Sequence, residues 1–204
     1  MPEYPTLPLI AINLDRRADR WNTLVKAFPN HTIERFSAIE LEGKHPADGC
    51  RESHLAALRL AKERNYPWVA ILEDDCYPYE NFDADLPGVL SFLWRNRAEW
   101  DIYNGGPVKA GSISKHSKNF LRIGDWISTH FLIIHSSAYD KILSTFNPLK
   151  DDQRIDAYYA TRFNTLASYP LIAYQAPSYS DLSLQHEDNM GHFNNTIRSF
   201  RMFF

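Results

Sequence analysis

The sequence predicts an α/β fold in which a mostly parallel, mixed sheet is flanked by helices. Continuous apolar runs of strand length recur, as at 7–14 and 68–72, and such runs are typical of strands buried on both faces. Segments with helical periodicity alternate with them, as at 50–65, and this alternation indicates a sheet covered by helices. In such sheets, ligands bind beyond the carboxyl ends of the strands.

The size and composition are those of a globular protein. The chain has 204 residues, of which 44% are hydrophobic and 23% charged, so we expect a single domain over 1–204 with one core. The net charge of −3 argues against a nucleic-acid partner, which needs a basic face. Two cysteines, Cys50 and Cys76, are too few for a secreted disulfide scaffold and are interpreted as reduced packing residues.

The first half of the chain is the more regular. We expect strands at 7–14, 32–39 and 68–72, and helices at 16–28 and 50–65. The helix at 50–65 carries Leu55, Leu58 and Ala61 on one face, and Asp48 or Gly49 is expected to cap its start.

The second half is less regular. We expect strands at 101–104, 120–123, 130–134 and 170–174, a helix at 137–146 capped by Ser136, and a helix at 152–163. The stretch 194–204 is apolar and basic, with no acids. Docking of this tail on the domain or on another subunit is favoured, and peripheral contact with a membrane is the alternative.

The start of the chain shows no targeting signal. It lacks a basic leader, and its apolar runs are too short to cross a bilayer. We therefore expect a soluble, cytoplasmic protein.

Three consecutive acids follow the apolar run at 68–72. Glu73, Asp74 and Asp75 repel one another, so the cluster is costly unless a cation lies among them. Oxygen ligands suit magnesium or manganese, which keep open positions for phosphates. The alternative is a solvated turn whose acids cap a helix.

The first strand is followed by a polar and basic loop. Asn13, Leu14 and Arg16, with Arg20 further on, suit a nucleotide base held by backbone groups and a phosphate held by arginine. A helix start with intrahelical ion pairs is the competing interpretation. The glycine-rich patterns of dinucleotide sites and P-loops are absent from the sequence.

Several of these segments together resemble glycosyltransferase family 25. The segments are Ile12-Asn13-Leu14-Asp15-Arg16 with Arg20, Phe36-Ser37-Ala38, Gly49-Cys50-Arg51-Glu52-Ser53-His54-Leu55, Ile71-Leu72-Glu73-Asp74-Asp75, Thr129 to Ile134, Pro148 through Ile155-Asp156, and Ser180-Asp181-Leu182. The resemblance covers residues 8 to 186. The family includes bacterial lipooligosaccharide galactosyltransferases and collagen galactosyltransferases.

The resemblance implies a GT-A fold, a nucleotide-binding α/β sandwich, and inverting transfer of a sugar. The donor would be a UDP-sugar, with galactose favoured, and the acceptor a hydroxyl of a saccharide or glycoconjugate, as in lipopolysaccharide biosynthesis. Mn²⁺ or Mg²⁺ would bind Asp75, with Glu73 near the ribose or a metal-bound water and Asp74 behind them. His186 would be a further metal ligand by its position near the C-terminus. Nucleotide binding is assigned to Asn13, Leu14, Arg16, Arg20, Ala38, Ser53, His54, Glu73 and Asp74.

An inverting transfer needs a base for the acceptor proton, and Asp156 and Asp181 are the candidates. Asp156 is preferred because Tyr158 and Tyr159 follow it and aromatic faces suit sugar rings. The alternative is an acid paired with Arg154 or Arg162.

Two other functions remain open. One is a catalytically inactive module that binds nucleotide sugars. The other is a sugar nucleotidyltransferase, which ranks last because the sequence has no glycine-rich loop after the first strand.

Overall fold

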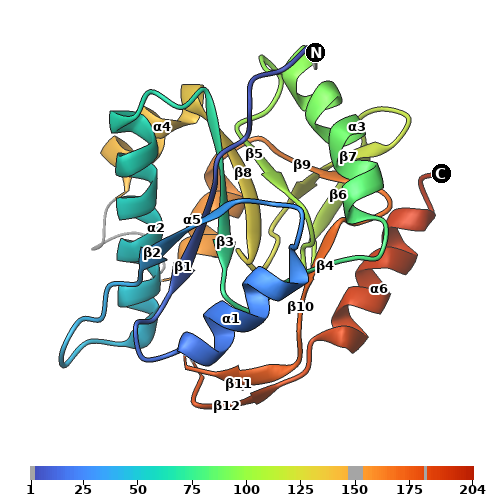
Figure 1. The fold of residues 1–204 in the computed structure, drawn as a ribbon. Helices are drawn as coiled ribbons and strands as arrows, with labels where there is room; N and C mark the ends of the chain where they lie inside the picture. The colour runs from blue at the N-terminus through green and yellow to red at the C-terminus, as the bar shows by residue number, and fades with distance from the viewer. Residues whose placement is uncertain (1–2, 147–153, 182) are drawn as a thin grey trace.

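The computed structural model describes residues 3–146, 154–181 and 183–204. A central eight-stranded sheet has the order β2-β1-β3-β8-β5-β9-β7-β6 (Figure 1). Its strands are β1 (Leu9–Asn13), β2 (Ile33–Ser37), β3 (Trp68–Glu73), β5 (Ile102–Asn104), β6 (Ser112–Lys115), β7 (Phe120–Gly124), β8 (Phe131–His135) and β9 (Thr165–Ser168).

The sheet is mixed, as the sequence predicted. β1 runs parallel to both β2 and β3, whereas β8 runs antiparallel to its neighbours β3 and β5. β5 and β9 are parallel again. The carboxyl ends of β1, β2, β3 and β5 therefore meet at one edge of the sheet, which is where the polar sequence motifs lie.

Helices cover both faces of the sheet. They are α1 (Ala18–Ala27), α2 (Pro46–Glu63), α3 (Phe82–Arg95), α4 (Ser136–Thr145), α5 (Ile155–Arg162) and α6 (Met190–Arg201). Strand residues alternate between two hydrophobic clusters: one includes side chains of α2, α4, α5 and α6, and the other includes those of α1 and α3. Figure 1 shows α2, α4 and α5 on the opposite side of the sheet from α3. This sandwich confirms the α/β fold class expected from the sequence.

Helix α2 begins earlier than predicted. Its N-cap is His45, whose Nδ1 accepts from the N–H of Ala47 at 3.1 Å, and Pro46 occupies the first helical position. Gly49 therefore lies inside the helix. A Cβ built on Gly49 would lie 2.4 Å from the carbonyl oxygen of Ile39, so the missing side chain lets the two backbones touch.

Two small ribbons stand apart from the main sheet. β4 (Cys76–Pro78) pairs antiparallel with β10 (Ala173–Gln175), and β11 (Ser178–Ser180) pairs with β12 (Gln185–Glu187). The strand predicted at 170–174 overlaps β10, which pairs with β4 outside the main sheet, and β9 was not predicted.

The end of the chain packs against the domain. Phe193 and Phe200 of α6 are fully buried in the core, and Thr196 Oγ1 donates to the carbonyl of Val108 at 2.7 Å. The ring of Phe204 stacks on Tyr169 with centroids 5.4 Å apart. This confirms docking of the tail. Among the described residues, every helix is too short or too polar to cross a membrane.

Two predicted features lie partly outside the described residues. Helix α5 corresponds to the end of the helix predicted at 152–163, while residues 152 and 153 lie outside the description. The same holds for Pro148 and Leu182, which contributed to the family resemblance.

Candidate functional site

Three acids extend from the end of β3 at the edge where β1 also ends. Glu73 is the last residue of β3, and Asn13 is the last residue of β1. Asp74 and Asp75 are largely buried, with 8% and 9% of their surfaces exposed, whereas Glu73 is partly exposed. The cluster is therefore not a solvated turn, and each carboxylate needs a partner.

Glu73 is held by hydrogen bonds from two elements. Its Oε1 accepts from Thr129 Oγ1 at 2.6 Å and lies 3.1 Å from His54 Nε2. Burial acts to raise the pKa of Glu73, but the hydrogen bond and charge of His54 and the hydrogen bond of Thr129 outweigh it and lower the pKa to about 2. Glu73 is accordingly ionised at neutral pH.

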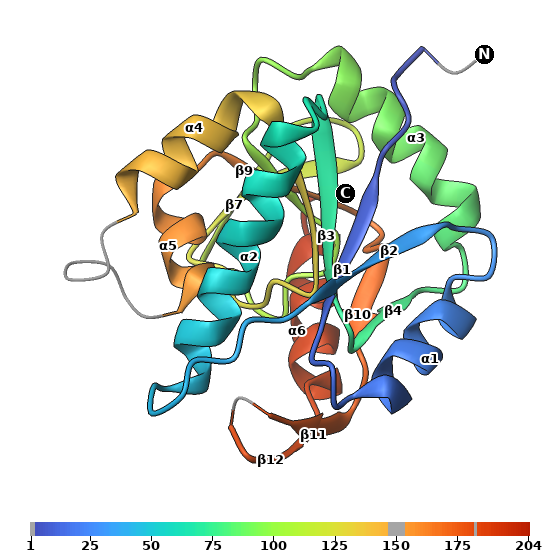
Figure 2. The same cartoon turned by 60° about the vertical axis from the view of Figure 1, so that its left-hand side comes forward.

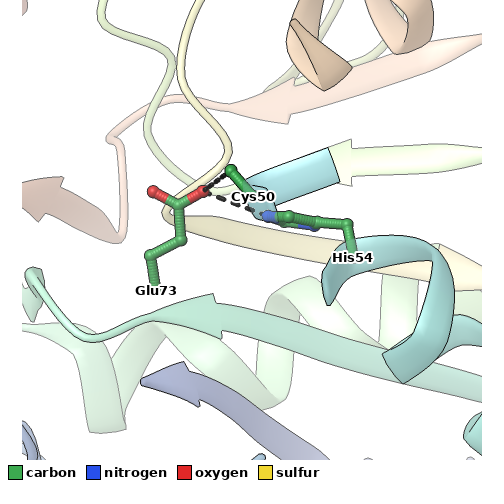
Figure 3. A group of neighbouring side chains, drawn as sticks. All are labelled: Cys50, His54 and Glu73. Carbon is green, nitrogen blue, oxygen red and sulfur yellow. Dashed lines mark hydrogen bonds and ion pairs between the residues drawn. The ribbon is translucent and has the colours of Figure 1, made fainter. Parts of the chain in front are cut away.

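Cys50 and His54, one turn apart on α2, both face Glu73 (Figure 3). Cys50 Sγ lies 4.0 Å from Glu73 Oε1. Burial and the charge of Glu73 raise the pKa of the Cys50 thiol well above its usual value, so the sulfur is a neutral packing group. Among the described residues this is the one group of three potential metal ligands, and it includes neither Asp75 nor His186.

Arg20 from α1 lies between the other two acids. Its Nε is 2.9 Å from Asp74 Oδ1, and its Nη2 is 2.6 Å from Asp75 Oδ2. Burial, together with the charge of Asp75, outweighs Arg20 and raises the pKa of Asp74 to about 6. The sequence predicted a cation among the three acids, and the guanidinium of Arg20 supplies part of that positive charge. The sequence had instead assigned Arg20 to a phosphate.

Asp75 keeps one oxygen for a ligand. Its Oδ2 accepts from Gln175 Nε2 at 2.9 Å as well as pairing with Arg20. Its Oδ1 is buried and has no hydrogen-bond partner among the described residues. A carboxylate oxygen of this kind is the donor that Mg²⁺ and Mn²⁺ prefer, so the residues fit the expected ion.

The loop after β1 is tied to this edge. Asn13 Nδ2 donates to Asp74 Oδ2 at 2.6 Å, and Asn13 Oδ1 accepts from Arg35 Nε at 2.8 Å. The N–H of Ala38 bonds to the carbonyl of Asn13, and the carbonyl of Leu14 closes a turn with the N–H of Arg17. Three predicted nucleotide-binding residues, Asn13, Leu14 and Ala38, are therefore brought together beside the acids.

Asp181 is surrounded by arginines. Arg16 Nη2 lies 2.8 Å from its Oδ1, Arg17 Nη1 bonds to its Oδ2, and Arg20 Nη1 lies 3.7 Å away. Asp181 directly follows β11, and Figure 2 shows the ribbon of β11 and β12 beside α1. Asp181 is thus engaged by three arginines, whereas a base must be within hydrogen-bond reach of the acceptor hydroxyl.

Asp156 is held differently, at the start of α5. Its Oδ2 accepts from the N–H of Ser128 at 3.2 Å, and its Oδ1 accepts from the N–H of Ala157 at 2.8 Å. Ser128 is followed by Thr129, whose hydroxyl bonds to Glu73, which places Asp156 on the Glu73 side of the cluster. Neutral donors orient this carboxylate without cancelling its charge.

The aromatic wall expected beside Asp156 is wrong. Tyr158 and Tyr159 are 2% and 0% exposed, and the hydroxyl of Tyr158 donates to the carbonyl of Ile142. Both rings pack in the core because α5 turns that face towards the sheet. Two partly buried rings lie instead on the ribbon that follows Asp75, where Tyr77 of β4 and Tyr174 of β10 are cross-strand neighbours 5.9 Å apart.

Ser53 and His186 lie away from any open site. Ser53 is fully buried, and its Oγ donates to the carbonyl of Gly49 and accepts from the N–H of Ile39, each at 2.7 Å. It fastens α2 to the segment after β2. His186 is exposed on β12, edge-to-face with Tyr179 at 5.8 Å, and the structure does not gather it with Glu73 and Asp75.

Sequence reasoning missed Thr129 as a partner of Glu73 and Gln175 as a partner of Asp75. Thr129 was noted only within the family resemblance, and Gln175 stands one hundred positions from its partner. Neither residue carries a local pattern that indicates such a contact.

Comparison with known proteins supports the fold. No family model matches the chain, and no curated protein matches it in sequence. The crystal structure of A197 from STIV has 18% identity and a TM-score of 0.55, with 89% of this chain and 93% of that chain covered. This likeness shows a shared fold.

Two further structures have lower scores. A glycosyltransferase involved in glycosylation of the major capsid of PBCV-1 has 16% identity and a TM-score of 0.41, with 71% and 69% of the two chains covered. Mannose-1-phosphate geranyltransferase from Thermus thermophilus has 7% identity and a TM-score of 0.42, with 81% and 60% covered. At these scores neither structure contributes to the argument on function.

Proposed function

We propose that the chain is a metal-dependent, inverting glycosyltransferase of family 25 type. It moves a sugar, with galactose favoured, from a UDP-sugar to a hydroxyl of a glycan or glycoconjugate, and it acts as a single cytoplasmic domain. The observation that carries the proposal is the unpartnered, buried Oδ1 of Asp75 at the carboxyl end of β3. Ligands of α/β sheets bind at this edge.

The donor is held by both sides of this edge. Asp75, with Glu73 beside it, would hold Mn²⁺ or Mg²⁺, and the bound ion would neutralise charge on the diphosphate leaving group. Arg16 and Arg20, which pair with acids in the structure, would also face the phosphates, and the Asn13–Leu14 turn would lie along the nucleotide with Ala38. His186 is the least supported metal ligand because it is exposed on β12.

Asp156 acts as the base. The acceptor oxygen attacks the anomeric carbon, the bond from that carbon to the diphosphate oxygen breaks, and the hydroxyl proton passes to the Asp156 carboxylate. The amides of Ser128 and Ala157 orient that carboxylate. A positioned base of this kind contributes about 10²- to 10⁴-fold in rate.

The first test is a donor screen. Thermal unfolding is followed with a panel of nucleotide sugars plus Mn²⁺, and the preferred donor is expected to raise the melting temperature because it binds only the folded chain. Slow hydrolysis of that donor then serves as the assay. A panel in which no nucleotide sugar stabilises the chain contradicts the proposal.

Two variants divide the roles. Asp75→Asn is expected to abolish both Mn²⁺-dependent donor binding and turnover, whereas Asp156→Asn is expected to lower kcat about 10²- to 10⁴-fold with donor affinity retained. Asp181→Asn is the matched comparison for the base. Donor binding without turnover in the parent chain points to the inactive binding module.

A further inference from the structure

Gln175 contacts Asp75 through a fixed amide. It is the last residue of β10, opposite Cys76 in the ribbon with β4. Its Oε1 accepts from Asn189 Nδ2 at 2.9 Å, which directs its Nε2 towards Asp75 Oδ2 at 2.9 Å. Because Oε1 is already occupied by a donor, the amide has one favourable orientation.

The contacts of Asp75 fall on one of its two oxygens. Gln175 and Arg20 both donate to Oδ2, while Oδ1 is buried and has no hydrogen-bond partner among the described residues. A backbone contact adds to this, since the N–H of Ala176 bonds to the carbonyl of Asp75 at 3.0 Å. Two donors on one oxygen fix the rotamer, and the other oxygen is left for a ligand.

Gln175 and Arg20 differ in what they do to the charge. Arg20 cancels charge on Asp75, so it orients the carboxylate and also weakens its attraction for a cation. Gln175 is neutral and orients the carboxylate at no cost in charge. Partners behind a metal ligand commonly set metal affinity by 10- to 100-fold.

We propose that Gln175 is a positioning residue that presents Oδ1 of Asp75 to the divalent cation. This inference rests on the proposed function. Asn189, which precedes α6, holds the amide in turn, so the docked C-terminal helix contributes to the geometry of the cation site.

The test measures binding of Mn²⁺ directly, by electron paramagnetic resonance of the free ion, with and without UDP. Gln175→Met keeps the length of the side chain and removes its donor, and we expect the Kd for Mn²⁺ to rise about 10- to 100-fold. Gln185→Met is the matched control, because Gln185 is exposed on β12, and it is expected to bind Mn²⁺ as the parent does.

A second variant covers the case in which Gln175→Met does not fold. Asn189→Ala leaves the donor on Gln175 but frees its amide, and a smaller rise in Kd is expected. Urea unfolding of each variant confirms that a folded chain is compared.

The outcomes separate the inference from the proposed function. If the parent chain binds no Mn²⁺, or if Asp75→Asn binds it equally well, the metal site itself is rejected. If the parent binds Mn²⁺, Asp75→Asn does not, and both Gln175→Met and Asn189→Ala match the parent, the role of Gln175 is rejected and the site remains.

Discussion

Glu73 and Asp74 are neighbours in the chain, yet the structure treats their carboxylates in opposite ways. The side chain of Glu73 meets donors from α2 and Thr129, and its pKa falls to about 2. The side chain of Asp74 meets Asn13 and Arg20, and burial raises its pKa to about 6. Glu73 ends β3 and Asp74 begins the turn after it, so one short acidic run lies in two environments.

The difference shows that a charged partner does not by itself keep the pKa of a buried acid low. Asp74 has a guanidinium at 2.9 Å, but it shares that guanidinium with Asp75 and lies in a drier place. Glu73 has hydrogen-bond donors and is partly exposed. Desolvation and the like charge of Asp75 therefore raise the pKa of Asp74, whereas hydrogen bonding lowers the pKa of Glu73.

The largest effect is expected when the guanidinium that Asp74 and Asp75 share is removed. Arg20→Met leaves Asp74 and Asp75 buried without their counter-charge, so we expect the free energy of unfolding at pH 7 to fall by about 3–5 kcal/mol. Urea denaturation followed by circular dichroism measures the change.

Glu40→Gln provides the control for Arg20→Met. The pair between Arg16 and Glu40 is 50% and 59% exposed, and its loss is expected to cost less than about 1 kcal/mol. Equal, small losses in the two variants would show that Arg20 does not stabilise the buried acids.

The pH dependence of stability sharpens the comparison. The pKa of Asp74 rises from 3.8 to about 6 on folding, so between these values the unfolded chain releases a proton that the folded chain keeps. The contribution of Asp74 is therefore most favourable below about pH 4 and is lost as pH rises to about 6, by roughly 3 kcal/mol.

The contribution of Glu73 to stability changes with pH in the opposite direction. Its pKa falls from 4.5 to about 2 on folding, so its contribution is present above about pH 4.5 and is lost as pH falls towards 2. The test compares the free energy of unfolding of the parent and of Asp74→Asn from pH 3 to 7. The stability of the parent relative to the variant is expected to decrease from pH 4 to 6, and a constant difference would contradict the raised pKa.

The smallest of these effects concerns Thr129. Thr129→Val preserves shape and removes the hydroxyl that donates to Glu73 Oε1, so we expect a loss of about 2 kcal/mol at pH 7. The loss should shrink towards pH 2, where Glu73 is protonated. An equal loss at both pH values would mean that the valine side chain of the variant simply packs badly.

The elements predicted best are those whose pattern is set by the core. The apolar runs at 7–14 and 68–72 became β1 and β3, because strands covered by helices on both sides need apolar residues at every position. Helix α3 was missed. It contains Pro87 and buried positions such as Phe82, Val89 and Leu93, and the proline obscured its helical period.

The acids of the site were predictable because they end a buried run, but their partners were not. Thr129 and Gln175 reach Glu73 and Asp75 through the order of strands, which depends on packing between distant segments. The choice between Asp156 and Asp181 depends on the same information, since arginines pair with Asp181 whereas backbone N–H groups bond to Asp156.

The position of helix α2 beside Glu73 depends on the absence of a side chain at Gly49. The helix that carries Cys50 and His54 approaches Ile39 so closely that a single methyl group at position 49 would meet an oxygen at 2.4 Å. Alanine at position 49 would force the helix or the Ile39 segment to shift, and any movement of the helix would carry the imidazole of His54 with it relative to Glu73. The hydrogen bond between His54 and Glu73, and with it the lowered pKa of Glu73, therefore depends on the absence of a side chain at position 49.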